Sequence, residues 1–134
     1  METAGIDHVN IRIPEDGVDE ALEFYRGVLG MEPEKLDLYR EGERTSFAFR
    51  ISRGSLLHVR PVEDFETPED HSFDHFCILF EGGIEDLKEA LEEGGVGIER
   101  EGTPWGAEGR GPAVYVRDPF GYLVELKKAT STTV

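Results

Sequence analysis

Two short stretches decide the fold: IDHVNIRI at residues 6–13 and FDHFCILF at residues 73–80. Each contains an Asp-His dipeptide, and the second dipeptide lies 67 residues after the first. The same spacing leads from His58 to Glu125. Because 67 residues are half of the 134-residue chain, four residues of metal-ligand type divide evenly between two equal halves. The pattern therefore predicts two similar modules that share one metal.

The first half of the chain predicts a strand, a helix and three further strands. In residues 6–13, apolar and polar side chains alternate, which is typical of a strand with one face against a core. Residues 18–29 carry apolar side chains at helical spacing and are followed by Gly30, so they predict an amphipathic helix. The three further strands are predicted at residues 36–40, 45–51 and 56–62.

The second half repeats this order after an acidic, proline-containing boundary at residues 63–72. Its strand, helix and three strands are predicted at residues 73–80, 84–93, 97–101, 113–117 and 121–127. The fold class predicted from both halves is α+β. We expect two paired βαβββ modules, residues 1–67 and 68–134, to form one compact domain whose curved mixed sheet surrounds a metal site.

The composition favours a cytoplasmic protein. A net charge of −15 at pH 7 argues against binding to nucleic acid and to anionic membrane surfaces. No apolar run approaches the roughly 20 residues that span a bilayer, and the N-terminus lacks the pattern of a signal peptide. The single cysteine, Cys77, allows no intrachain disulfide. The spread of acidic residues also suggests adaptation to high salt, which predicts loss of circular dichroism in low salt.

Three histidines and one glutamate on predicted strands are candidate metal ligands: His8, His58, His75 and Glu125. Imidazole and carboxylate together suit Zn, Ni, Co, Mn or Fe(II). A carboxylate that faces inward from a buried strand must be paired or coordinated, because an unpaired buried charge costs several kcal/mol. In the alternative, purely structural interpretation, the histidines are relics of duplication and Glu125 pairs with Arg60 or Lys127.

Four other features have a local explanation as well as a functional one. Cys77 is expected to be a small buried core residue rather than a pocket thiol, and His71 to be solvated in the boundary segment. Trp105, in the Gly- and Pro-rich loop at residues 102–112, is expected to anchor its loop rather than stack on a substrate. The sequence DPFG at residues 118–121 predicts a turn into the last strand.

Four stretches together resemble the vicinal oxygen chelate superfamily, which includes glyoxalase I, extradiol dioxygenases, methylmalonyl-CoA epimerase and the fosfomycin and bleomycin resistance proteins. The stretches are DHV at 7–9, FYRGVLGM at 24–31, DHF at 74–76 and DPFGYLVEL at 118–126. The resemblance covers nearly the whole chain. It implies paired βαβββ modules around a divalent metal ion, a small-molecule substrate and a homodimer.

The resemblance also implies roles for single residues. His8, His75 and Glu125 match ligand positions of the superfamily, and His58 matches the fourth position, where glyoxalase I usually has Glu and the epimerase Gln. Glu125 is thus the only carboxylate in the set, so Glu125 and His58 are the candidate catalytic residues for proton transfer. In the superfamily the metal stabilises an oxyanion on a substrate that is chelated through neighbouring oxygens.

These observations favour a metal-dependent lyase or isomerase of glyoxalase type. An Fe(II) extradiol-type dioxygenase is the alternative, with His8, His75 and Glu125 as its two-histidine, one-carboxylate triad. A third interpretation is a non-enzymatic protein that binds a small molecule, as resistance proteins do. Candidate contacts for an anionic substrate are Arg12, Arg60 and Arg110.

Overall fold

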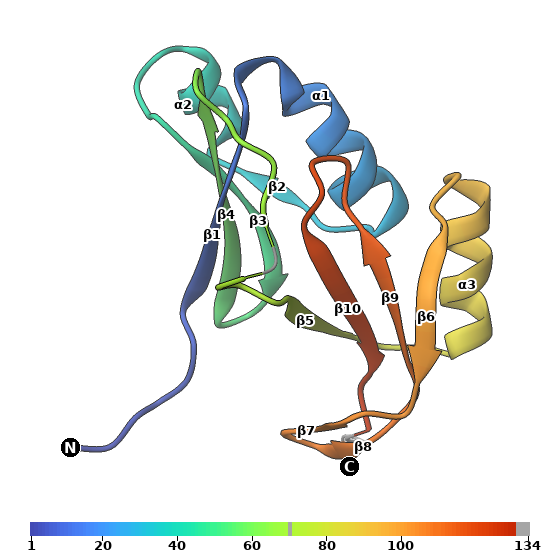
Figure 1. The fold of residues 1–134 in the computed structure, drawn as a ribbon. Coiled ribbons are helices and arrows are strands. Elements are labelled where there is room, and N and C mark those ends of the chain that lie inside the picture. The colour runs from blue at the N-terminus through green and yellow to red at the C-terminus, as the bar shows by residue number, and fades with distance from the viewer. Residues whose placement is uncertain (70, 131–134) are drawn as a thin grey trace. The chain divides into compact units, whose positions relative to one another are not determined.

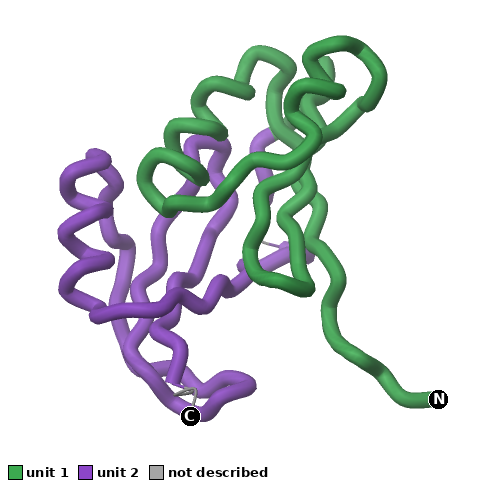
Figure 2. Tube along the Cα trace, turned by 180° about the vertical axis from the view of Figure 1, so that it is seen from behind, with its two compact units in different colours: residues 1–66 green, residues 67–134 purple. Residues whose placement is uncertain are grey.

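The computed structural model describes residues 1–69 and 71–130, and the chain divides into two compact units (Figures 1 and 2). Unit 1 comprises Met1–Glu66 and unit 2 comprises Thr67–Val134. Each unit contains a four-stranded mixed sheet and helical segments, which confirms the predicted α+β class. None of the helices in the described part of the chain is long and apolar enough to cross a membrane.

Unit 1 begins with β1 (His8–Pro14), which pairs in parallel with β4 (Ser55–Val62). Between them in the sequence come β2 (Pro33–Glu34) and β3 (Phe47–Ser52). The order of the strands in the sheet is β1-β4-β3-β2. Both remaining strand pairs, β4 with β3 and β3 with β2, are antiparallel. Three of the predicted strands, at residues 6–13, 45–51 and 56–62, are therefore present, with shifts of one or two residues at their ends.

The helix predicted at residues 18–29 is an irregular helical segment. A 3-10 turn at Glu15–Gly17 leads into α1 (Val18–Ala21), which continues as a π-helical stretch, Leu22–Val28. Its apolar face is buried as expected, and the ring of Tyr25 packs 5.3 Å from that of Phe49 on β3. This contact attaches the helical segment to the sheet of unit 1.

The prediction of a strand at residues 36–40 is wrong, because this segment forms the short helix α2 (Leu36–Arg40). Lys35 has a positive φ of 64°, so the chain turns sharply between β2 and α2. The helical turn allows the Tyr39 ring to pack 5.7 Å from that of Phe47. The outer strand of the sheet is instead β2, where Glu34 accepts two hydrogen bonds from Arg50 of β3, at 2.7 and 2.8 Å.

Unit 2 repeats the topology of unit 1. Its sheet has the order β5-β10-β9-β6, formed by β5 (Phe76–Phe80), β10 (Leu123–Lys128), β9 (Ala113–Arg117) and β6 (Ile98–Gly102). As in unit 1, the first and last strands pair in parallel. Helix α3 (Ile84–Glu93) buries Leu91 and is linked to β6 by a 2.6 Å ion pair between Lys88 and Glu101. The predicted loop at 102–112 contains a small hairpin, β7 (Trp105–Gly106) and β8 (Gly109–Arg110).

The 67-residue repeat is reproduced in the strand register. In unit 1 the Cα of His58 is paired with Asn10 on one side and Ala48 on the other. In unit 2 the Cα of Glu125 is paired with Cys77 on one side and Tyr115 on the other. Each residue of the second set lies 67 positions after its counterpart in the first. The two candidate ligands therefore occupy equivalent places at the centre of two equivalent sheets.

The core of each unit lies on one side of its sheet. Along β1, Ile11 and Ile13 are buried between more exposed polar residues, which confirms the predicted alternation. Along β10, Val124 and Leu126 are buried as expected, but so are Glu125 and Lys127 on the other face. The last strand is thus covered on both sides, which makes the polar groups of Glu125 and Lys127 dependent on partners.

The turn predicted at residues 118–121 is present and is held by the buried Asp118. One carboxylate oxygen, Oδ1, accepts hydrogen bonds of 2.9 Å from the backbone N–H groups of Phe120 and Tyr122. Gly121 has a φ of +103°, a conformation that favours glycine. The turn fixes where β10 begins and hence where Glu125 lies in the sheet.

We expect Asp118→Ala to lower the free energy of unfolding by about 3 kcal/mol, because two backbone donors in a buried turn lose a charged acceptor. Urea denaturation would measure this change. The matched control is Asp64→Ala, an exposed carboxylate whose removal should change stability by less than about 0.5 kcal/mol. Equal stabilities of the two variants would contradict the role given to Asp118.

Candidate functional site

In unit 1 the structure brings His8 and His58 together. His8 is the first residue of β1, and His58 lies in the middle of the neighbouring strand β4. Their rings stack with centroids 4.3 Å apart and an interplanar angle of 19°. His8 Nδ1 donates a hydrogen bond of 2.7 Å to Asp7 Oδ2. Unit 1 therefore presents two adjacent imidazoles, one of which is oriented by a carboxylate.

The environment of His58 favours the neutral imidazole. Burial lowers the pKa of His58, and the nearby His8 and Arg44 lower it further. A histidine binds a metal ion through a neutral ring nitrogen, so this direction of shift suits a ligand.

In unit 2 the structure brings His75 and Glu125 together. His75 directly precedes β5, and its Nε2 lies 2.9 Å from Oε1 of Glu125 on β10. Its other ring nitrogen, Nδ1, donates a hydrogen bond of 2.6 Å to Asp74 Oδ1. Glu125 is only 6% exposed, so the prediction that this carboxylate must be paired is confirmed, with His75 as its partner. The alternative partner Lys127 instead donates a 2.6 Å hydrogen bond to the Gly109 carbonyl.

Tyr115 is the residue that the sequence did not reveal. Its ring meets that of His75 edge to face, with centroids 5.5 Å apart. The guanidinium carbon of Arg100 lies over the Tyr115 ring, 4.1 Å from its centroid. Burial raises the pKa of the Tyr115 hydroxyl, and hydrogen bonding to Glu125 raises it further, so the hydroxyl stays protonated. Tyr115 is thus a protonated group beside Glu125, its register partner on the neighbouring strand.

Cys77 lies on the opposite side of Glu125 from Tyr115 in the sheet. The expectation that it is a buried core residue is wrong, because β5 turns its Cys77 face outward while Phe76 and Ile78 fill the core. Desolvation, the charge of Glu125 and a hydrogen bond to Glu125 raise the pKa of the Cys77 thiol to about 12. Cys77 is therefore a neutral neighbour of the site and not a thiolate.

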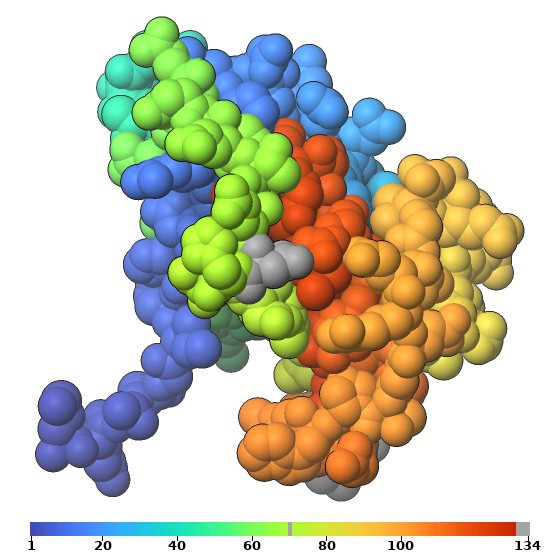
Figure 3. All heavy atoms as spheres, in the orientation of Figure 1, coloured from blue at the N-terminus to red at the C-terminus, as the bar shows by residue number. Residues whose placement is uncertain are grey.

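Trp105 and His71 are both exposed, and neither belongs to the two donor pairs. Trp105 is 79% exposed, so the expectation that it anchors the loop is wrong. The hairpin segment, orange at the lower end of the view, lies at the surface in Figure 3. The hairpin is held instead by the Lys127 amine, which also lies where a side chain at Gly106 would have to go. His71 is exposed beside Glu69, as expected for a solvated residue.

The donor chemistry of both pairs fits a divalent metal ion. Two donors that would share one metal, each about 2.1 Å from it, lie about 3 to 3.5 Å apart, and the 2.9 Å between His75 Nε2 and Glu125 Oε1 is close to this range. Asp7 and Asp74 hold Nδ1 of His8 and His75, so these rings would bind a metal ion through Nε2, which in His75 here contacts Glu125 Oε1. Among residues 1–69 and 71–130 no group of three or more His, Cys, Asp and Glu side chains is arranged around one point.

Comparison with known proteins identifies the family. The sequence model of the glyoxalase/bleomycin resistance protein/dioxygenase superfamily matches residues 5–126, which is most of the chain. The chain belongs to this superfamily. The predicted resemblance to vicinal oxygen chelate proteins is therefore confirmed, and members of this superfamily typically use a divalent metal.

Solved structures share the fold at low sequence identity. A virulence protein from Salmonella typhimurium is 22% identical, with a TM-score of 0.74 over 97% of this chain and 100% of that one. A glyoxalase family protein from Bacillus anthracis is 23% identical, with a TM-score of 0.73 over 97% and 98%. A fosfomycin resistance protein from Listeria monocytogenes is 15% identical, with a TM-score of 0.64 over 96% of each chain. No curated protein sequence matches the chain.

Proposed function

We propose that the protein is a metal-dependent enzyme, a glyoxalase-like lyase or isomerase that acts on a small oxygen-chelating substrate. In this proposal His8, His58, His75 and Glu125 together hold one divalent metal ion, with Zn, Ni, Co, Mn and Fe(II) as candidates. The two donor pairs contribute to one centre, either within a chain or between two copies in a homodimer. Superfamily membership supports the broad class of a metal-dependent protein with a small-molecule substrate.

The observation that carries the proposal is the duplicated Asp-His hydrogen bond. Asp7 and Asp74 each accept a hydrogen bond from Nδ1 of the following histidine, at 2.7 and 2.6 Å. A carboxylate in this position fixes the ring orientation and increases the basicity of Nε2, which is the usual arrangement around a metal-bound histidine. The exposed His71 also has a carboxylate neighbour, Glu69, but only the Asp-His pairs recur at equivalent places in both halves of the chain.

The side chains around Glu125 suit proton transfer next to a carbonyl. When bound, the metal acts as a Lewis acid that stabilises negative charge on the substrate oxygens. Glu125, buried and hydrogen-bonded, is the carboxylate that takes and returns a proton, and the Tyr115 hydroxyl holds it in place. His58, which favours its neutral form, is the second candidate base.

Tyr115 also supports a second function, an Fe(II) extradiol-type dioxygenase. His8, His75 and Glu125 supply two imidazoles and one carboxylate, the donor set of many non-haem Fe(II) oxygenases. From the sequence, His58 was the only candidate acid or base beside this triad. The structure adds Tyr115, so that Tyr115 lies by His75 and His58 lies by His8. Oxygen uptake with a catechol by protein loaded anaerobically with Fe(II) would favour this function over the first.

We expect Asp74→Asn to weaken zinc affinity by about 10- to 100-fold, because the carboxylate no longer orients the His75 ring. Competition with a chromophoric chelator would measure the affinity. Asp86→Asn, on an exposed position of α3, removes the same charge from the same unit and should leave the affinity within about twofold. If both variants bind zinc as tightly as the parent protein, Asp74 does not support a metal ligand.

We expect Glu125→Gln to lower turnover at saturating metal by at least about 100-fold, because an amide cannot carry the proton. The assay uses the thiol adduct of an α-oxoaldehyde in D2O, with deuterium incorporation followed by NMR. Glu92→Gln, exposed at the end of α3, serves as the control and should keep full activity. Full activity of Glu125→Gln would remove Glu125 as the base, and a selective loss in His58→Gln would assign that role to His58.

A further inference from the structure

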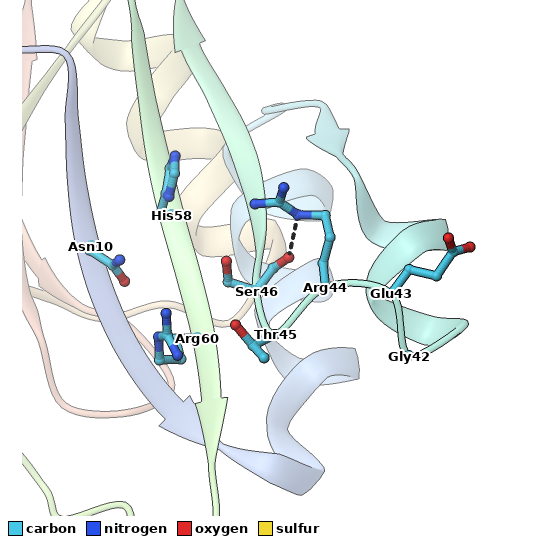
Figure 4. Close-up of a pocket in the computed structure, with 8 residues that line it drawn as sticks. All are labelled: Asn10, Gly42, Glu43, Arg44, Thr45, Ser46, His58 and Arg60. Atoms are coloured by element: carbon cyan, nitrogen blue, oxygen red, sulfur yellow. Dashed lines mark hydrogen bonds between the residues drawn. The ribbon is translucent and has the colours of Figure 1, made fainter.

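Unit 1 contains a polar pocket of about 480 Å³ on the same face of the sheet as His58 (Figure 4). Its lining residues with neutral polar or basic side chains are Asn10, Arg44, Thr45, Ser46, His58 and Arg60. Besides the imidazole, these side chains offer two guanidinium groups, an amide and two hydroxyls. The pocket is therefore rich in hydrogen-bond donors although the chain as a whole carries a net charge of −15.

The fold directs these donors to one place. His58 and Arg60 are two residues apart on β4 and so point to the same face of the sheet, and Asn10 is the register partner of His58 on β1. The segment that enters β3 closes the opposite side, where Gly42 turns the chain with a φ of +80°. Arg44 follows this turn, and its Nε donates a 3.2 Å hydrogen bond to the Ser46 carbonyl. This bond leaves the two terminal nitrogens of Arg44 directed towards His58 (Figure 4).

Among the described residues, no carboxylate ion pair offsets the charge of the pocket's two arginines. Arg50 is ion-paired with Glu34, and Arg117 with Glu99. Within the described residues no carboxylate pairs with Arg44 or Arg60. Glu43 is the acidic residue in the lining, and its carboxylate is directed away from His58 and Arg60 in Figure 4. In the described part of the chain Arg40 and Arg53 also lack an ion pair, so what distinguishes Arg44 and Arg60 is that they line one pocket together with His58, where their charges suit an external anion.

We propose that this pocket is an oxyanion subsite that binds a carboxylate, phosphonate or phosphate group of the substrate. Arg44 and Arg60 supply the charge and a planar fork for paired hydrogen bonds, and Asn10, Thr45 and Ser46 supply neutral donors. His58 lines the same pocket, so an anionic group held there lies beside a proposed metal ligand. The assignment of the pocket to a substrate rests on the proposed function. It implies that the substrate is an anionic oxygen compound.

Of the arginines that the sequence suggested for an anion, the pocket contains only Arg60. Arg110 lies in unit 2 and donates a 3.1 Å hydrogen bond to the Thr103 carbonyl. Arg44 was not predicted, because its approach to β4 depends on the turn at Gly42.

The test is an NMR titration of the full-length protein, stripped of metal with chelator, with inorganic phosphate and separately with acetate. We expect at least one of these anions to shift the side-chain Nε–H signals of Arg44 and Arg60 and the backbone amide of Ser46 in a saturable manner. In Arg44→Gln/Arg60→Gln the affinity should fall at least about tenfold, because two charged donors are lost. Arg40→Gln/Arg53→Gln, with the same net charge and both substitutions at exposed positions of unit 1, should change the affinity less than twofold.

Equal losses in the two double variants would overturn the proposal, because binding would then reflect net charge alone. So would an absence of shifts with both anions, or shifts confined to residues outside the pocket. Circular dichroism of both variants establishes that they are folded. Because the titration is carried out without metal, saturable binding in the pocket supports the subsite even if metal-dependent catalysis is not found.

Discussion

The buried carboxylate of Glu125 is the constraint on which the candidate site depends. A charge that is 6% exposed costs several kcal/mol unless other groups compensate for it. The compensation comes from the His75 ring at 2.9 Å, and Tyr115 is the register partner of Glu125 on the other side. Both groups reach Glu125 because β10 lies between β5 and β9 in the sheet, so each neighbouring strand supplies one side of its environment.

The two units use one scaffold for different chemistry. At the centre of unit 1 the equivalent position holds a neutral imidazole, His58, and the neighbour corresponding to Tyr115 is the small Ala48. His58 also lines the pocket that contains Arg44 and Arg60. Unit 2 thus carries the carboxylate donor with Tyr115 beside it, and unit 1 carries a histidine with the two arginines of its pocket. This division agrees with a protein that holds a metal and an anionic substrate together, as we propose.

Local patterns in the sequence predicted the parts of the fold that depend on local periodicity. Alternation in β1 and β5 identified their buried faces, and the spacing from His58 to Glu125 identified equivalent positions in two sheets. The assignment of residues 36–40 failed because the Lys35 turn and the packing of Tyr39 on Phe47 determine that segment. Tyr115 and Arg44 were missed for a similar reason. Their proximity to Glu125 and His58 depends on strand register and on a loop turn, which no single stretch of sequence reveals.

Metal content is the most direct test of whether the two donor pairs hold one divalent ion. The protein is purified in high salt without a histidine tag or chelators, and its metals are measured by mass spectrometry before and after loading with divalent ions. We expect about one metal ion per chain, or per site shared between two chains, and its loss in both His8→Ala and His75→Ala. Absence of metal after loading with each candidate ion, or retention of the metal in either variant, would contradict a centre built from both pairs.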